Sequence, residues 1–192
     1  MEKEVAETTK EQELQQEQAV AEEQVTPAQG DDAAAEPVEP EEPVELTDLD
    51  RARECLQAGK TLVLCKGETV YMSERQGIGQ MLEYLEEKVD LRGFSAADKV
   101  IGRAAAMLFA SAGVKEVWGD VVSRAALPVL EAYDISYRYG RLADRIINRR
   151  GDGLCPMEEA ILAANTPREA YNILRERYRT LTGYSPRTQK QE

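Results

Sequence analysis

Histidine is absent from all 192 residues of the sequence. A catalytic zinc site normally takes three protein ligands from His, Cys and carboxylates and keeps a water in the fourth position. Because the chain offers no imidazole and no Cys-x-x-Cys pair, we expect neither an ordinary zinc hydrolase nor a zinc deaminase, and no bound cofactor. Catalytic triads built on histidine are excluded for the same reason. Carboxylates alone still leave Mg²⁺ binding open.

Long hydrophobic runs are also lacking. No apolar run approaches the roughly 20 residues of a transmembrane helix, and the charged start of the chain does not have the pattern of a signal peptide. The three cysteines, Cys55, Cys65 and Cys155, form neither a close pair nor an even disulfide set. We therefore expect reduced thiols, a cytoplasmic location and no membrane partner.

Charge of one sign is concentrated in one segment. Residues 1–46 contain 15 acidic and 2 basic residues, whereas the remainder contains 21 acidic and 22 basic residues. The first 46 residues also contain no aromatic side chain, so they are expected to form a disordered acidic arm. Two interpretations of this arm remain open, a solubilising tail or a docking peptide for a basic protein partner. The nearly neutral remainder argues against a nucleic-acid-binding surface.

Apolar periodicity predicts one α/β domain over residues 47–182, followed by a frayed tail over 183–192. Thr47 and Asp50 form a capping box ahead of a helix that Gly59 ends. The expected strands are 61–65, 69–73, 114–118 and 135–139, with 141–148 ambiguous, and the expected helices are 78–88, 95–112, 123–132 and two that begin at Pro156 and Pro167. Alternating strands and helices indicate a three-layer α/β/α architecture with a mixed sheet of about five strands.

Asp98 is the first candidate site residue. In the predicted helix 95–112, Ser95 is the N-cap and Asp98 the N3 acid, and both serve backbone donors. This structural role explains Asp98 completely, and the alternative is a proton carrier in a site at the start of the helix. Lys99 is not explained by capping, so it is either a solvated side chain or a ligand-binding one.

The second candidate is the segment 151–159. Its glycines, Gly151 and Gly153, would let backbone N–H groups approach an anion, although the Lys-Ser/Thr ending of a P-loop is missing. Cys155 stands in the N-cap position that Thr166 occupies before the next helix. A neutral thiol is a poor acceptor, so Cys155 is either a tolerated mismatch or a reactive thiolate at a positive helix end, with Glu158 acting against the second interpretation.

Three segments carry a resemblance to a known family. They read TLVLCKGETVY at 61–71, GFSAADKVIGRAAA at 93–106 and INRRGDGLCPMEEA at 147–160. With them, residues 46–182 resemble a prokaryotic family described as domain of unknown function 1893. The resemblance implies a fold similar to that of cytidine deaminases, with helices on both sides of a mixed five-stranded sheet. Zinc deaminase chemistry does not follow, because the expected helix starts at Asp98 and Ser123 offer no ligand set.

Our leading hypothesis is therefore a zinc-less, deaminase-like domain that binds a nucleobase, a nucleotide or a similar small anion among helix N-termini. The expected binding residues are Lys99, Ser123, Gly151 and Gly153. An enzymatic version would use Cys155 as the nucleophile and Asp98 or Glu158 as the proton carrier. The competing hypothesis is a catalytically silent interaction module whose working part is the arm 1–46.

Overall fold

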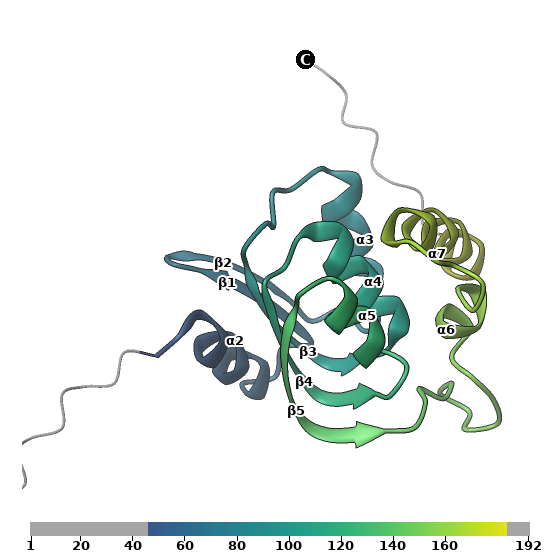
Figure 1. The fold of residues 1–192 in the computed structure, drawn as a ribbon, viewed down its shortest axis with the longest axis horizontal. Coiled ribbons are helices and arrows are strands. Elements are labelled where there is room, and N and C mark those ends of the chain that lie inside the picture. The colour runs from purple at the N-terminus through teal and green to yellow at the C-terminus, as the bar shows by residue number, and fades with distance from the viewer. Residues whose placement is uncertain (1–45, 184–192) are drawn as a thin grey trace, which may run out of the picture. The chain divides into compact units, whose positions relative to one another are not determined.

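The computed structural model describes residues 46–183, so the predicted arm before residue 46 and the predicted tail after residue 183 lie outside the described residues. Five strands form one sheet in the order β2-β1-β3-β4-β5 (Figure 1). The strands are β1 (Leu62–Lys66), β2 (Thr69–Ser73), β3 (Ser95–Ile101), β4 (Glu116–Ser123) and β5 (Ser136–Ala143). β1 is antiparallel to both β2 and β3, whereas β3, β4 and β5 are parallel. The predicted α/β class, hairpin and mixed five-stranded sheet are confirmed.

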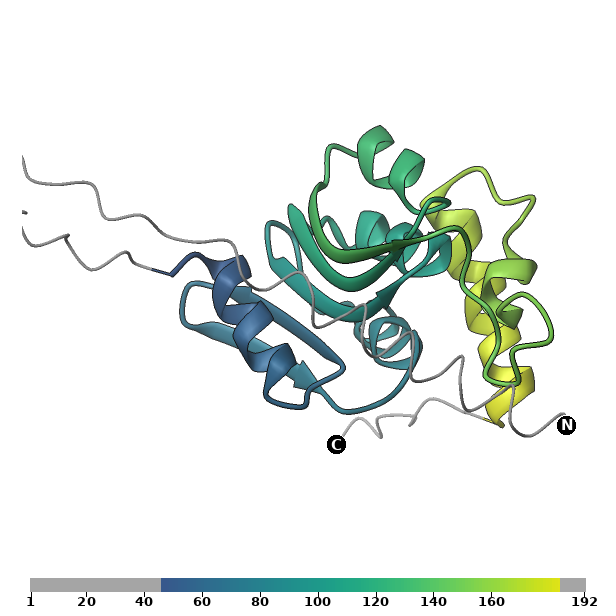
Figure 2. The same cartoon turned by 90° about the horizontal axis from the view of Figure 1, so that it is seen from below.

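Helices lie on both faces of this sheet. They are α2 (Asp48–Gln57), α3 (Gly79–Glu86), α4 (Arg103–Ala112), α5 (Leu127–Ala132), α6 (Pro156–Ala160) and α7 (Pro167–Thr182). α2 packs on β1, β3 and β4, whereas α4 covers the opposite face and carries α7 on its outer side (Figure 2). The predicted starts of α2, α6 and α7 are confirmed: Thr47 and Thr166 accept hydrogen bonds as N-caps, and proline opens α6 and α7.

The core follows from the alternation of side chains along β1. Val63 and Cys65 face α2, where they pack with Leu56. Leu62 and Leu64 point to the opposite face, into the larger cluster built around α4. Since successive strand residues point to opposite faces, a continuous apolar run in β1 serves both clusters. This strand is therefore buried on both sides by helices.

One predicted helix is wrong. Residues 95–112 are not a single helix, because residues 95–101 form strand β3 and only Arg103–Ala112 are helical. The alanines favour a helix locally, but residues 95–101 lie between β1 and β4 as the central strand of the sheet. Hydrogen bonds to both neighbouring strands, together with burial, override the local preference for a helix. Ser95 does not cap a helix; its Oγ donates to Glu116 at 2.6 Å. The predicted capping role of Asp98 is wrong as well.

Two further boundaries differ from the prediction. Ser123 does not begin a helix but ends β4, and α5 begins four residues later. The ambiguous segment after residue 140 continues β5 as far as Ala143. Beyond it, Ile147 and Leu154 form an isolated antiparallel bridge. These strands are longer than predicted because parallel pairing continues past the apolar residues that signalled them.

Leu64→Ala tests the two-sided burial of β1. Leu64 is fully buried, so its truncation should lower the free energy of unfolding by about 2–5 kcal/mol. Leu162→Ala makes the same change at a side chain that is 66% exposed and should stay within about 0.5 kcal/mol of the unmodified protein. Urea unfolding followed by circular dichroism measures both, and equal losses would contradict the assigned core.

Candidate functional site

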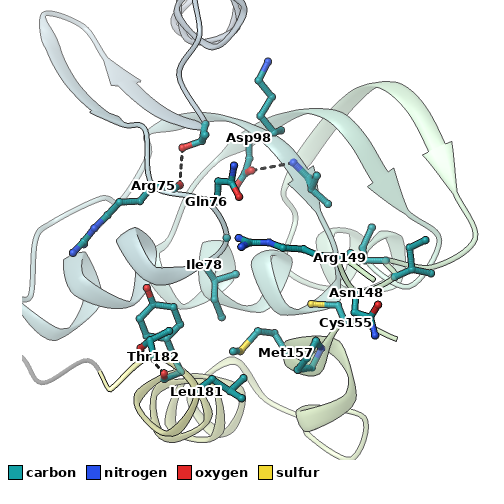
Figure 3. A pocket seen from close by; sticks show the side chains of 18 of the residues that line it. Arg75, Gln76, Ile78, Asp98, Asn148, Arg149, Cys155, Met157, Leu181 and Thr182 are labelled. Atoms are coloured by element: carbon teal, nitrogen blue, oxygen red, sulfur yellow. Dashed lines mark hydrogen bonds between the residues drawn. The ribbon is translucent and has the colours of Figure 1, made fainter. Parts of the chain in front are cut away.

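A pocket of about 1090 Å³ opens at the carboxyl end of β3 (Figure 3). Its walls come from the start of β1, the loop between β2 and α3, the end of β3, the segment after β5, the start of α6 and the last turns of α7. The lining residues are Thr61, Arg75, Gln76, Gly77, Ile78, Asp98, Lys99, Val100, Ile146, Ile147, Asn148, Arg149, Arg150, Cys155, Pro156, Met157, Tyr178, Leu181 and Thr182. Segments that are far apart in the sequence therefore meet here.

Asp98 is the one acidic side chain among the lining residues. It lies near the end of β3, half-buried, and its Oδ1 accepts a hydrogen bond from the Val100 N–H at 3.0 Å. Burial, with a smaller contribution from the charge of Asp120, raises the pKa of Asp98 to about 7 against the opposing effect of backbone N–H donors. Its carboxyl group is therefore poised between its neutral and ionised forms near neutral pH.

Cys155 lies on the opposite side of the pocket from Asp98, and its side chain points into the cavity (Figure 3). It is the N-cap residue of α6 by position, but its side chain makes no capping hydrogen bond. Its backbone N–H donates to the carbonyl of Ile146 at 2.9 Å, which ties the start of α6 to the segment after β5. The thiol is thus a partly exposed lining group and not a core side chain.

The rest of the pocket divides into a polar and an apolar part. Gln76 lines the same pocket as Asp98, and the guanidinium group of Arg149 extends towards the middle of the cavity (Figure 3). Ile78, Met157 and Leu181 lie together below them in the same view. An apolar surface facing a few polar groups is the usual composition of a small-molecule site.

Glu158 has a different environment from the one the sequence suggested. Its side chain is only 7% exposed and caps α4, since Oε1 accepts from Ala104 N–H at 2.8 Å and Oε2 from Arg103 N–H at 3.0 Å. Burial raises its pKa, although the two N–H donors oppose that effect. A Cβ atom at Gly102 would clash with the Glu158 carboxylate, so glycine leaves the room that this carboxylate occupies. Glu158 does not line the pocket.

The pocket brings together three of the predicted site residues, Asp98, Lys99 and Cys155. The amine of Lys99, however, pairs with Asp120 at 2.9 Å. Ser123 does not line the pocket: it is fully buried, and its hydroxyl has no hydrogen-bond partner within residues 46–183. The catalytic and binding roles of these residues stay predictions.

Gly151 and Gly153 also lie outside the lining, because they belong to a turn organised by Asn148. The backbone N–H of Asn148 donates to the Gly153 carbonyl at 2.9 Å, and the Gly151 N–H donates to the Asn148 carbonyl at 3.1 Å. Gly151 has a φ of +77°, a left-handed conformation that glycine adopts without steric cost. Gly151 and Gly153 thus contribute to the backbone conformation and hydrogen bonds of the turn.

Sequence reasoning missed Gln76, Ile78 and the α7 residues Tyr178 and Leu181 as lining residues. The turn at Gly77 ahead of α3 is the sequence signal that could have indicated Gln76 and Ile78. No local pattern marks the last turns of α7, whose amphipathic spacing predicts only packing. Across residues 46–183, no group of three or more His, Cys, Asp or Glu side chains is arranged for a metal ion. No helix in this range is long and apolar enough to cross a membrane.

Asp98→Asn should change how stability depends on pH. Because the folded pKa of Asp98 lies above its unfolded value, folding favours the protonated form; this stabilisation is complete below about pH 4 and is lost as the pH rises through 7. The free energy of unfolding of the unmodified protein, relative to that of the variant, should therefore fall by about 2 kcal/mol between pH 5 and pH 8. Denaturant titrations at several pH values measure this difference.

The control for that series is Asp144→Asn, which makes the same change outside the pocket at a side chain that is 89% exposed. Its free energy of unfolding should stay within about 1 kcal/mol of that of the unmodified protein, because the exposed ion pair of Asp144 with Arg124 contributes little. A pH-independent difference for Asp98→Asn would show that Asp98 ionises as readily in the folded chain as in the unfolded one.

Glu158→Ala should destabilise the domain by roughly 1–3 kcal/mol, because two N–H donors at the start of α4 lose their acceptor. Glu158→Gln should cost less, since an amide oxygen still accepts one of these hydrogen bonds. Glu159→Ala removes the neighbouring exposed carboxylate and should change thermal stability little. The cap assignment fails if Glu158→Ala and Glu159→Ala melt at the same temperature.

Comparison with known proteins places this geometry in a family. A family model described as TM1506, domain of unknown function (DUF1893), matches residues 51–178. The crystal structure of a DUF1893 family protein (TM1506) from Thermotoga maritima is similar with a TM-score of 0.60 and 22% sequence identity, covering 71% of this chain and 90% of that chain. At this identity, the structural likeness concerns the fold alone. No curated protein matches the chain. Because the family model covers more than half of the sequence, the chain belongs to the DUF1893 family.

Proposed function

We propose that this domain binds a small molecule of the nucleobase or nucleotide class in the pocket at the end of β3. The observation that carries the proposal is Asp98, the single carboxyl group, with a pKa of about 7, in a cavity whose other lining residues are cationic, uncharged polar or apolar. A carboxyl group near its titration midpoint accepts hydrogen bonds in one form and donates one in the other. It can therefore match either pattern on the edge of a heteroaromatic ring.

The neighbouring groups support the same ligand class. The amide of Gln76, which lines the same pocket as Asp98, offers a second donor and acceptor for the edge of a ring. Ile78 and Met157 present apolar and polarisable atoms against which a planar ring would pack. A volume of about 1090 Å³ is slightly above the usual range for small-molecule sites and is sufficient for a mononucleotide.

The strand order gives a further, weaker argument. A sheet of order β2-β1-β3-β4-β5, with β1 antiparallel to β3 and three parallel strands beyond it, agrees with the deaminase-like, three-layer fold that the resemblance implies. We propose this fold assignment together with the ligand class, although a shared fold is only an analogy for function. The enzymatic version of the proposal keeps Cys155 as the nucleophile. It assigns proton transfer to Asp98, because Glu158 already serves the start of α4.

The competing interaction module assigns the function to the arm 1–46, and no feature of residues 46–183 favours it. The two hypotheses separate in one experiment, because Cys155 lines the pocket whereas Cys55 lies on α2 outside it. A ligand in the pocket should slow alkylation of Cys155 by iodoacetamide and leave alkylation of Cys55 unchanged. The rate at Cys55 is thus a control within the same molecule.

The full chain should be titrated with the four nucleobases, ribonucleosides and ribonucleoside 5′-monophosphates. At least one compound should raise the melting temperature and slow alkylation of Cys155 severalfold, since a ligand of the native state stabilises it. Asp98→Asn should weaken that binding at least tenfold, about 1.4 kcal/mol, whereas Asp144→Asn should not alter it. If no compound affects either measurement, the proposed function is wrong, and capture of a protein partner that depends on residues 1–46 would favour the interaction module.

A further inference from the structure

We infer that Arg149 binds an anionic group of the ligand, so that the pocket prefers a phosphorylated compound to its neutral counterpart. This inference rests on the proposed function, because it assigns the ring and the anion of one ligand to different side chains of the same pocket. It assigns a role to a residue that the catalytic hypothesis leaves unused. The argument begins with the charges that line the pocket.

Four cationic side chains line the pocket against one carboxyl group, and three of them already have carboxylate partners. Arg75 pairs with Glu83, Lys99 with Asp120 at 2.9 Å, and Arg150 with Asp152 at 3.8 Å. Arg149, the fourth, makes no ion pair and no side-chain hydrogen bond within residues 46–183. The lining thus contains one cation whose charge no described carboxylate neutralises.

The direction of the Arg149 side chain is the second observation. Although Arg149 is an exposed residue, its guanidinium group extends towards the middle of the pocket, below Gln76 and Asp98 and above Ile78 (Figure 3). An arginine that only keeps the protein soluble has no need to point into the pocket, since it could equally point into bulk water. A guanidinium group inside a concave site presents its N–H donors to whatever occupies that site.

The backbone that carries Arg149 is held on both sides. Ile147 and Leu154 form an antiparallel bridge, and the Asn148 side chain donates to Asp152 Oδ1 at 2.7 Å while accepting from the Arg150 N–H at 3.0 Å. These bonds close a short turn on either side of Arg149. Fixing the backbone in advance reduces the entropy lost when the side chain binds an anion. Asn148 is therefore a positioning residue for Arg149.

The chemistry of guanidinium selects the anion. Its planar fork of N–H groups matches two oxygens of a phosphate, and hydrogen bonds between charged partners are stronger than neutral ones. The ionised form of Asp98 would repel the same phosphate, so the phosphate belongs beside Arg149, whereas Asp98 faces the edge of the ring. A 5′-nucleotide has both groups, separated by a sugar.

The test compares three probes on the full chain: each ribonucleoside, its 5′-monophosphate and ribose 5-phosphate. The monophosphate should bind at least tenfold more tightly than its nucleoside, and raising the salt concentration should narrow this difference. Arg149→Ala should remove the difference while leaving affinity for the nucleoside unchanged, and Arg149→Lys should restore part of it. Arg145→Ala is the matched control, because Arg145 is exposed on the same segment but does not line the pocket.

The outcomes separate this inference from the proposal on which it rests. If a nucleoside and its monophosphate bind equally and Arg149→Ala changes neither affinity, the role of Arg149 is overturned and the ring-binding proposal stands. If ribose 5-phosphate binds through Arg149 but no nucleoside or nucleotide binds, the anion site is supported and the ring-binding proposal is wrong. If none of the three probes binds, both are overturned.

Discussion

Two backbone N–H groups at the start of α4 donate to the carboxylate of Glu158, which lies more than fifty residues further along the chain. Helix starts carry unsatisfied donors and a partial positive charge, so a buried α4 needs an acceptor at this position. Gly102 lacks a side chain, and the acceptor therefore comes from another segment. This contact fixes the start of α6 against the central helix of the domain.

The position of the pocket wall follows from that contact. Cys155, Pro156 and Met157 immediately precede Glu158, so the carboxylate that caps α4 also holds them beside the end of β3. A second connection reinforces the first, since the Arg103 guanidinium donates to the carbonyl of Ala164 at 2.5 Å. The packing of α7 on α4 and α3, and the hydrogen bond from Arg179 to Glu86 at 2.6 Å, also keep the carboxyl-terminal helices beside the sheet.

The same contact explains which parts of the molecule could be predicted from sequence. The Thr47 cap, the β1–β2 hairpin and the proline that opens α7 depend on neighbours within a few residues, and each was recognised. Strand β3 depends on its place between β1 and β4, which no local pattern in an alanine-rich segment encodes. The partner of Glu158 is equally non-local, which is why its carboxylate was expected in the site.

Asp98 and Cys155 were singled out by arguments about helix starts, yet Asp98 reaches the pocket because it lies near the end of a strand. Leu181 and Tyr178 could not be foreseen at all, since an apolar residue on an amphipathic helix gives the same signal whether it faces a core or a cavity. The sequence thus indicated which side chains have the chemistry of a site better than it indicated which residues lie next to one another in the fold.

The pocket has walls in two separate layers. Asp98 and Lys99 belong to strand β3 of the sheet, whereas Leu181 and Thr182 belong to α7, which packs on α3, α4 and α6. Because α7 belongs to a separate layer, its sliding over α4 would change the width of the pocket without breaking any hydrogen bond between strands. An occupant touching both walls would join the layers, and amide hydrogens of α7 would then exchange with solvent more slowly.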